Sequence, residues 1–379
     1  MKVISPAKTN AEEFSLSHNV YFFTGFPGFI ASRILKKLIA DQPAANFIFL
    51  VRQSEVLLAN QRVADMKRSD SSYENKLKVI VGDITEENLG LSADVVEGFK
   101  GEVTHVFHLA AVYDLAVRKE IAEKANILGT KNVNRFVRSL PKLQRYIYFS
   151  TAYVSGNRVG RILESELDKG QGFKNFYEST KCEAEKLVQQ VWDKVPTTII
   201  RPGIVIGDSK TGETSKFDGP YFVLRFLDRF SFLPVPYIGK GQALMNMVPI
   251  DYIVNASTHL AHSPTAASKV FHLTNPNPPR AKEVYEKLCK EMLGVTPKYS
   301  VPTALVSASL SVSVLRRLIG VPRETLDYFE CGGEYDCSQA QQELSSAGIT
   351  CPNLFGFTDL IVKFYRDHRK DQERLPIVR

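Results

Sequence analysis

The fold of this 379-residue chain is decided by the stretch Val20-Tyr21-Phe22-Phe23-Thr24-Gly25-Phe26-Pro27-Gly28-Phe29-Ile30-Ala31. An apolar run of strand length ends at Phe23, glycines follow at positions 25 and 28, and apolar residues then recur at helical spacing from Ile34 to Ile39. Glycine allows a tight turn and a close approach of the backbone to a pyrophosphate, which the N-terminus of the next helix attracts. This succession of strand, loop and helix predicts a dinucleotide-binding site.

Further apolar runs of strand length follow at regular intervals, with helical patterns between most of them. They are Phe47–Val51, Val79–Val81, Val106–Leu109, Tyr146–Phe149, Thr198–Ile200 and Val270–Leu273. Continuous apolar strands that alternate with helices indicate a parallel sheet covered on both faces. The sequence therefore predicts a Rossmann-type, doubly wound α/β fold. The alternation ends near Pro202, which predicts a smaller, mainly helical C-terminal lobe.

The bulk composition is that of a soluble globular protein, with 44% hydrophobic and 23% charged residues. The formal net charge of +7 suits an anionic ligand or partner, or is simply a basic surface. No block rich in Arg and Lys supports nucleic-acid binding. The five cysteines lack C-x-x-C spacing and no signal peptide is evident, so we expect reduced thiols and a cytoplasmic protein.

The end of the second strand discriminates between cofactors. An NAD site carries an acid there, whereas the 2′-phosphate of NADP favours an arginine. Arg52 occupies this place, the first acid is Glu55, and Arg33 lies just beyond the glycine loop. The pattern predicts NADPH as cofactor, against the alternative of an arginine that is merely exposed at a strand end.

A second motif is Tyr177-Glu178-Ser179-Thr180-Lys181. A tyrosine and a lysine four positions apart share one helix face, and the ammonium is expected to lower the pKa of the phenol. With Thr151 from an upstream Ser-Thr pair, Tyr177 and Lys181 form a predicted catalytic trio that donates a proton to a carbonyl oxygen and holds it. The alternative is an ordinary pair on a helix surface.

These motifs, taken in order, resemble the extended short-chain dehydrogenase/reductases over roughly residues 19–275. The matching segments are Thr24-Gly25-x-x-Gly28-x-x-Ala31, Gly82-Asp83-Ile84, His108-Leu109-Ala110-Ala111, Asn126 with Gly129-Thr130, Ser150-Thr151, Tyr177-x-x-x-Lys181 and Arg201-Pro202-Gly203. The segment from Arg201 to Glu213, followed by Asp218-Gly219-Pro220-Tyr221, is similar to the thioester-reductase-like branch, which includes bacterial fatty acyl-CoA reductases and the reductase domains of carboxylic acid reductases.

The resemblance implies site residues beyond the glycine loop. Asp83 inherits a contact with the adenine, Lys181 a contact with the nicotinamide ribose, and the region of Pro202 a place beside the nicotinamide. Together with the loop, the predicted cofactor-binding residues are Thr24, Gly25, Phe26, Pro27, Gly28, Phe29, Ile30, Arg52, Asp83, Ile84, Leu109, Ala110, Ala111, Lys181, Pro202, Gly203 and Ile204.

The branch also implies a function: NADPH-dependent reduction of a fatty acyl thioester, on coenzyme A or an acyl carrier protein, to the aldehyde or onward to the alcohol. The alternatives are a ketone reductase or secondary alcohol dehydrogenase and a non-catalytic NADP(H)-binding protein. No H-E-x-x-H motif or Cys/His cluster is present, so we predict no metal. Cys182 and His108 are interpreted as packed residues rather than catalytic ones.

Three expectations concern organisation. Residues 1–18 are expected to be a flexible leader, 19–210 an NADP(H)-binding Rossmann domain with a strand returning near 248–275, and 211–247 with 276–379 a substrate-binding lobe. In one interpretation, the aromatic stretch 221–237 and the segment Val301–Ile319 line an acyl channel or contact a membrane surface peripherally. In the other, both segments simply pack in a lid or in the core. The oligomeric state is left open.

Overall fold

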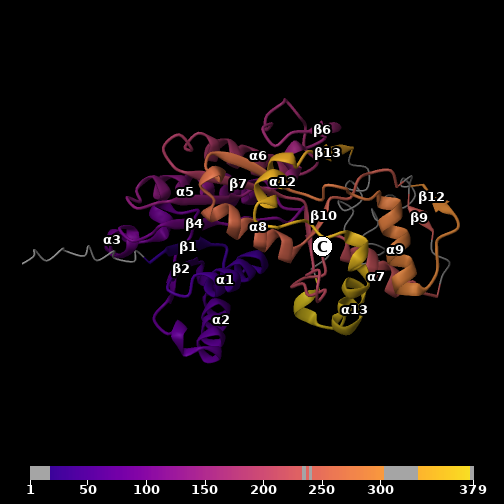
Figure 1. Ribbon diagram of the computed structural model, residues 1–379, viewed down its shortest axis with the longest axis horizontal. Helices are drawn as coiled ribbons and strands as arrows, with labels where there is room; N and C mark the ends of the chain where they lie inside the picture. Colours follow the sequence, from indigo (N-terminus) through magenta and orange to yellow (C-terminus); the bar gives the residue numbers. More distant parts are fainter. Residues whose placement is uncertain (1–17, 233–235, 239–240, 303–331, 376–379) are drawn as a thin grey trace, which may run out of the picture.

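The centre of the molecule is a sheet of seven parallel strands in the order β11-β7-β5-β4-β1-β2-β3 (Figure 1). The computed structural model describes residues 18–232, 236–238, 241–302 and 332–375. The strands are β1 (Val20–Thr24), β2 (Asn46–Val51), β3 (Leu77–Val81), β4 (His105–His108), β5 (Arg145–Phe149), β7 (Thr197–Pro202) and β11 (Lys269–Leu273). Each predicted apolar run corresponds to one of these strands, and the predicted Rossmann-type sheet is confirmed.

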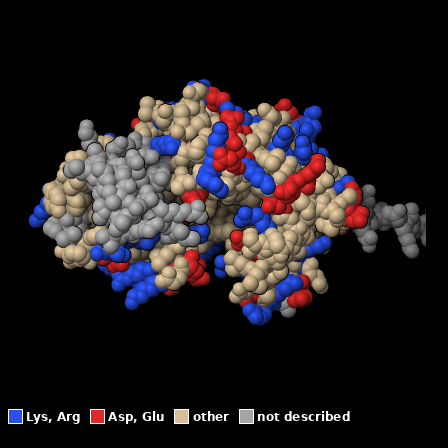
Figure 2. Space-filling model, turned by 180° about the vertical axis from the view of Figure 1, so that it is seen from behind, with Lys and Arg blue, Asp and Glu red and all other residues tan. Residues whose placement is uncertain are grey.

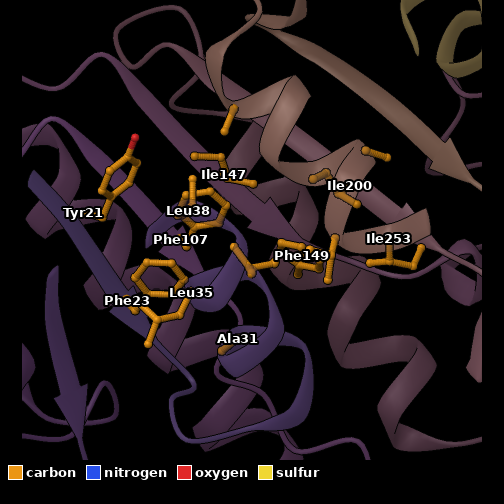
Figure 3. Close-up of a cluster of buried hydrophobic side chains, with 14 of the residues drawn as sticks. Tyr21, Phe23, Ala31, Leu35, Leu38, Phe107, Ile147, Phe149, Ile200 and Ile253 are labelled. Carbon is orange, nitrogen blue, oxygen red and sulfur yellow. The ribbon is translucent and has the colours of Figure 1, made fainter. Parts of the chain in front are cut away.

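Side chains of successive strand residues go to opposite faces of the sheet, and helices bury both faces. Phe23 lies beside Leu35 of α1 (Phe29–Asp41), as Figure 3 shows, and Tyr21 belongs to the same cluster, whereas Phe22 packs with Phe99 and Phe136 on the other face. The helices of the first face are α1, α2 (Val56–Ser69), α8 (Ile250–His262) and α12 (Ser338–Ser345); those of the second are α3 (Ala93–Lys100), α5 (Gly129–Arg138) and α6 (Phe176–Gln189). The sheet is therefore doubly wound, as predicted.

A separate hydrophobic cluster forms the mainly helical lobe. Its helices are α7 (Tyr221–Arg229), α9 (Ala281–Leu293) and α13 (Thr358–His368), and Phe217 lies fully buried among them. A parallel pair, β8 (Ile204–Ile206) and β10 (Met247–Pro249), connects this cluster to the end of β7. The lobe is thus attached where the sheet ends.

The remaining elements are short. They are β6 (Gly160–Ile162) paired with β13 (Gly333–Tyr335), β9 (Tyr237–Ile238) paired with β12 (Ser300–Val301), α4 (Lys119–Ala122), the π-helix η4 (Glu123–Leu128), and the single turns η1 (Gln53–Glu55), η2 (Ser71–Tyr73), η3 (Glu87–Gly90), η5 (Ala152–Ser155), η6 (Pro264–Ala266), η8 (Leu354–Gly356) and η9 (Gln372–Arg374). No helix in the described ranges has both the length and the apolar character needed to cross a membrane.

Parts of the sequence-based expectations lie outside the described residues. These are the leader, except for His18, residues 233–235 of the aromatic stretch 221–237, and residues 303–319 of the Val301–Ile319 segment. The domain boundaries remain predictions. Within them, α12 packs against β11 and α8, so part of the 276–379 segment lies on the sheet rather than in the lobe.

Candidate active site

The glycine loop forms a cradle that only glycine fits. Gly25 has a φ of +88°, and a Cβ there would lie 2.7 Å from the backbone nitrogen of Ala110. A Cβ on Gly28, the residue that precedes α1, would lie 2.6 Å from the carbonyl oxygen of Gly25. The bare backbone at the N-terminus of α1 therefore fits the pyrophosphate of a dinucleotide. Ala31, in the third position of the motif, is buried against the sheet.

The loop after β4 is held against this cradle by hydrogen bonds. The Ala110 backbone N–H donates to Thr24 Oγ1 at 3.2 Å, and Thr24 Oγ1 lies 2.7 Å from His108 Nδ1. His108 Nε2 lies 3.2 Å from Thr130 Oγ1, and burial lowers the pKa of His108 to about 3. His108 is therefore a neutral packing residue that connects β1, β4 and α5.

The predicted contacts to the adenosine half lie beyond the next two parallel strands. Arg52 follows β2 with an exposed side chain, 3.8 Å from Glu55. Asp83 follows β3, and its Oδ1 accepts a hydrogen bond from the Thr85 backbone at 2.8 Å. Because carboxyl ends of parallel strands share one edge of a sheet, both residues lie at the edge that carries the glycine loop. Arg33, by contrast, forms an ion pair with Glu213 at 2.5 Å.

The predicted catalytic residues meet at the end of β5. Thr151 follows this strand and precedes η5, with its Oγ1 accepting from the Tyr153 backbone. Tyr177 lies in the first turn of α6 and shares a side-chain hydrogen bond with Thr151. Burial raises the pKa of Tyr177 to about 12, although the hydrogen bond from Thr151 acts in the opposite direction. Tyr177 is therefore a neutral phenol near pH 7, which is the protonated form that a proton donor needs.

Lys181 is hydrogen-bonded to β5, and its predicted contact with the nicotinamide ribose stays a prediction. Its Nζ donates to Tyr148 Oη at 2.9 Å and to the carbonyl oxygen of Phe149 at 2.6 Å, beneath the site. Burial lowers the pKa of Lys181 to about 7, although Glu185 raises it. The prediction that Lys181 lowers the pKa of Tyr177 is wrong for this structure, because the amine is bound to β5 and burial of the phenol dominates.

Asn126 connects α6, which carries two of the predicted catalytic residues, to the loop after β4. Its Oδ1 accepts from the Val112 backbone at 2.9 Å, while its Nδ2 donates to the Val112 carbonyl oxygen and to Thr180 Oγ1. Asn126 lies in the π-helix η4, and such distortions occur frequently at functional sites.

Sequence reasoning missed a buried ion pair behind the predicted catalytic residues. Glu185 and Arg201 are essentially inaccessible to solvent, and Arg201 Nη2 lies 2.6 Å from Glu185 Oε1. Ser150 Oγ donates to Glu185 Oε2 at 2.5 Å, so the pair fixes the residue before Thr151 and the residue before Pro202. A signal was present, since Tyr177, Lys181 and Glu185 recur every four positions and so share one face of α6.

A polar cluster borders Tyr177 on the side of the lobe. Tyr113, about half exposed, makes side-chain hydrogen bonds with Lys216 and Asp218. Burial raises the pKa of Asp218, and Tyr113 is close enough to Tyr177 to raise the pKa of that phenol. Figure 2 shows a hollow near the middle of one face of the molecule, with lysine and arginine side chains on its rim.

Two other kinds of site, a cysteine nucleophile and a metal centre, find no support among the described residues. Burial raises the pKa of the Cys182 thiol to about 12, so the group stays protonated. No group of three or more His, Cys, Asp or Glu residues is arranged to hold a metal within the described ranges.

The fold and the glycine cradle agree with the predicted resemblance to the extended short-chain dehydrogenase/reductases. A solved structure of the terminal R domain from the myxalamid PKS-NRPS pathway superposes with a TM-score of 0.79 at 24% identity, covering 96% of this chain and 94% of that one. A thiolation-reductase di-domain from an archaeal non-ribosomal peptide synthetase gives a TM-score of 0.72 at 19% identity, covering 93% and 76%. At these identities the likeness establishes the fold alone.

Sequence comparison gives the family. The chain belongs to the family described as Male sterility protein, whose pattern matches residues 23–257, more than half of the chain. Similar proteins include the non-canonical nonribosomal peptide synthetase cpsA of Aspergillus campestris, 29% identical over 66% of this chain and 25% of that protein. Fatty acyl-CoA reductase wat of Drosophila melanogaster is 28% identical over 62% of this chain and 52% of that protein. The chain thus spans between a quarter and about half of the length of these relatives. The predicted resemblance to the thioester-reductase-like branch is confirmed.

Proposed function

We propose that the protein is an NADPH-dependent reductase of a fatty acyl thioester, with the aldehyde as first product. The observation that carries the proposal is the hydrogen bond between Thr151 and a neutral Tyr177, at the same edge of the sheet as the glycine cradle. A hydroxyl pair of this kind presents a proton donor to a carbonyl oxygen that gains negative charge.

The roles of the side chains follow from their surroundings. The cofactor, when bound, supplies the hydride to the carbonyl carbon. Tyr177 donates its proton to the carbonyl oxygen, and Thr151 holds that oxygen by a hydrogen bond. The resulting hemithioacetal on the substrate collapses to the aldehyde and a free thiol. Lys181 is bound to the Phe149 carbonyl, and its proposed role is to contact the nicotinamide ribose when the cofactor is bound.

The substrate class rests on the relatives. In the lobe, the gap between α7, α9 and α13, whose lining includes Ile206, Tyr221, Leu224, Met247 and Leu288, is too small for an aliphatic chain in this structure. Relatives named fatty acyl-CoA reductase and a solved thiolation-reductase di-domain support coenzyme A or a carrier protein as the thiol.

NADPH, rather than NADH, is the proposed reductant because of Arg52. Its guanidinium is exposed at the end of β2, where only a 3.8 Å contact with Glu55 competes for it among the described residues. A guanidinium binds a phosphate through paired, charge-assisted hydrogen bonds.

The test is a stoichiometric assay with purified protein, NADPH and palmitoyl-CoA, in which oxidation of NADPH and release of free thiol are followed together. We expect both to appear, at equal amounts for reduction to the aldehyde and at two NADPH per thiol for onward reduction to the alcohol. Tyr177→Phe should lower the rate by about 100-fold or more while leaving NADPH binding intact. Consumption of NADPH with a ketone, and none with acyl-CoA of any chain length, would instead favour a ketone reductase.

A further inference from the structure

One segment of the lobe, residues 211–218, also contacts the half of the molecule that carries the glycine cradle. Phe217 anchors the segment in the lobe, where its ring is fully buried and its N–H donates to the Arg374 carbonyl oxygen at 2.8 Å. Glu213 forms its ion pair with Arg33 of α1, the helix that begins at the cradle. The segment therefore connects the lobe to the predicted dinucleotide site.

Two side chains of the segment reach the loops at the edge of the sheet. Lys216 and Asp218, on either side of Phe217, make side-chain hydrogen bonds with Tyr113 in the loop after β4, and Lys216 Nζ lies 5.7 Å from the centre of the Tyr113 ring. Tyr113 acts most strongly to raise the pKa of Lys216, and Glu55, in η1 after β2, acts in the same direction. The ammonium is therefore within electrostatic reach of Glu55 as well.

The order of the strands places this ammonium over the cradle. In the sheet β1 lies between β4 and β2, and neighbouring strands are about 4.8 Å apart. A side chain that reaches both the loop after β4 and the turn after β2 lies over the end of β1, where Gly25 and Gly28 form the cradle. Lys216 is exposed, so a ligand in the cradle can reach its ammonium.

A dinucleotide in the cradle carries a negative charge on each phosphate of its pyrophosphate. The N-terminus of α1 offers a partial positive charge of about half a unit, and Arg33 is already paired with Glu213. A lysine ammonium brings a full charge and three donors on a flexible stem. We infer that Lys216 binds the pyrophosphate of the dinucleotide, so that the 211–218 segment covers the cofactor from the side of the lobe. The inference rests on the proposed function, since it requires a dinucleotide in the cradle.

The test measures binding by calorimetric titration rather than turnover. Lys216→Met is compared with Lys290→Met, which removes the same charge from an exposed position on α9 in the lobe. Each protein is titrated with NADPH, with NADH, and with 2′-AMP, which carries the 2′-phosphate but no pyrophosphate.

We expect Lys216→Met to bind NADPH and NADH each about tenfold more weakly, because both lose one charge-assisted hydrogen bond. Binding of 2′-AMP should be unchanged, and Lys290→Met should bind all three ligands as the wild type does. Lys216→Arg, which keeps the charge, should recover most of the affinity for NADPH and NADH.

Three results would overturn the inference while leaving the proposed function intact. The first is an unchanged affinity of Lys216→Met for NADPH and NADH. The second is a loss that extends to 2′-AMP or is confined to NADPH, which would assign Lys216 to the adenosine half beside Arg52. The third is an equal loss in Lys216→Met and Lys216→Arg, which would point to a disturbed fold. Failure of the wild type to bind NADPH or NADH would overturn the proposed function and the inference together.

Discussion

At the glycine loop the backbone itself forms the predicted binding surface, whereas in α6, which carries two of the predicted catalytic residues, the surface is made of side chains held by other side chains. Gly25 and Gly28 act by lacking a Cβ, and their neighbours are fixed by strand geometry. Tyr177, Lys181 and Glu185 act through buried polar groups whose partners come from β5 and β7. We therefore expect the glycine loop to be sensitive to added side-chain volume, and α6 to be sensitive to the loss of a buried charge.

The largest effect is expected when the buried ion pair at α6 loses its carboxylate. Glu185→Gln leaves the Arg201 guanidinium buried without a carboxylate, which should lower the free energy of unfolding by about 3–5 kcal/mol. Urea unfolding measures it. Glu183→Gln is the matched control on the same helix, since that carboxylate is half exposed beside Lys186 and should cost less than about 1 kcal/mol. Similar losses for the two variants would mean that burial of the pair contributes little.

The second-largest effect is expected when a side chain is added in the glycine loop. Gly25→Ala places a Cβ 2.7 Å from the Ala110 nitrogen at a φ of +88°, so we expect a loss of about 3 kcal/mol in unfolding free energy and of dinucleotide binding. Gly98→Ala, in α3, meets no described atom within 4 Å and should instead stabilise the protein by about 0.5–1 kcal/mol. Thermal unfolding and NADPH titration are measured for both variants. If Gly25→Ala is as stable as the wild type and binds NADPH normally, the hypothesis that this loop forms a cradle for the cofactor is wrong.

The buried amine of Lys181 should make the stability of the protein depend on pH. The pKa of Lys181 is about 7 in the folded protein against 10.5 for the free side chain, so between these pH values the unfolded chain binds more protons and stability rises with pH. Lys181→Met should remove this slope, a difference on the order of 2–4 kcal/mol across the interval. Lys36→Met, on the exposed side of α1, should keep it. Parallel stability curves for the wild type and Lys181→Met would show that the amine titrates normally.

The smallest effect is expected at an exposed charge. Arg52→Ala should weaken binding of NADPH about tenfold and leave NADH unchanged, because only the 2′-phosphate uses the guanidinium. Arg62→Ala, exposed on α2, serves as control for the loss of general positive charge. If NADPH and NADH lose affinity equally in Arg52→Ala, this arginine does not read the phosphate.

The same contrast explains how much could be predicted from sequence. Strands such as Val20–Thr24 and the turn at Gly25 depend on local patterns, because apolar runs and glycines specify backbone geometry wherever they occur. The direction of Lys181 and the Glu185–Arg201 pair depend on contacts between residues up to 33 positions apart. No spacing rule contains that information, so the pKa of Tyr177 was predicted in the wrong direction.

The packing of α1 against α8 has a consequence for synthesis of the chain. Helix α1, which follows the glycine loop, ends at Asp41. Helix α8, which covers α1 and includes Ile253, ends only at His262 (Figure 3). A nascent chain therefore leaves the side of α1 that α8 covers exposed while more than half of the protein is translated. We expect ribosome-bound intermediates shorter than about residue 262 to be recognised by chaperones at this side of the helix.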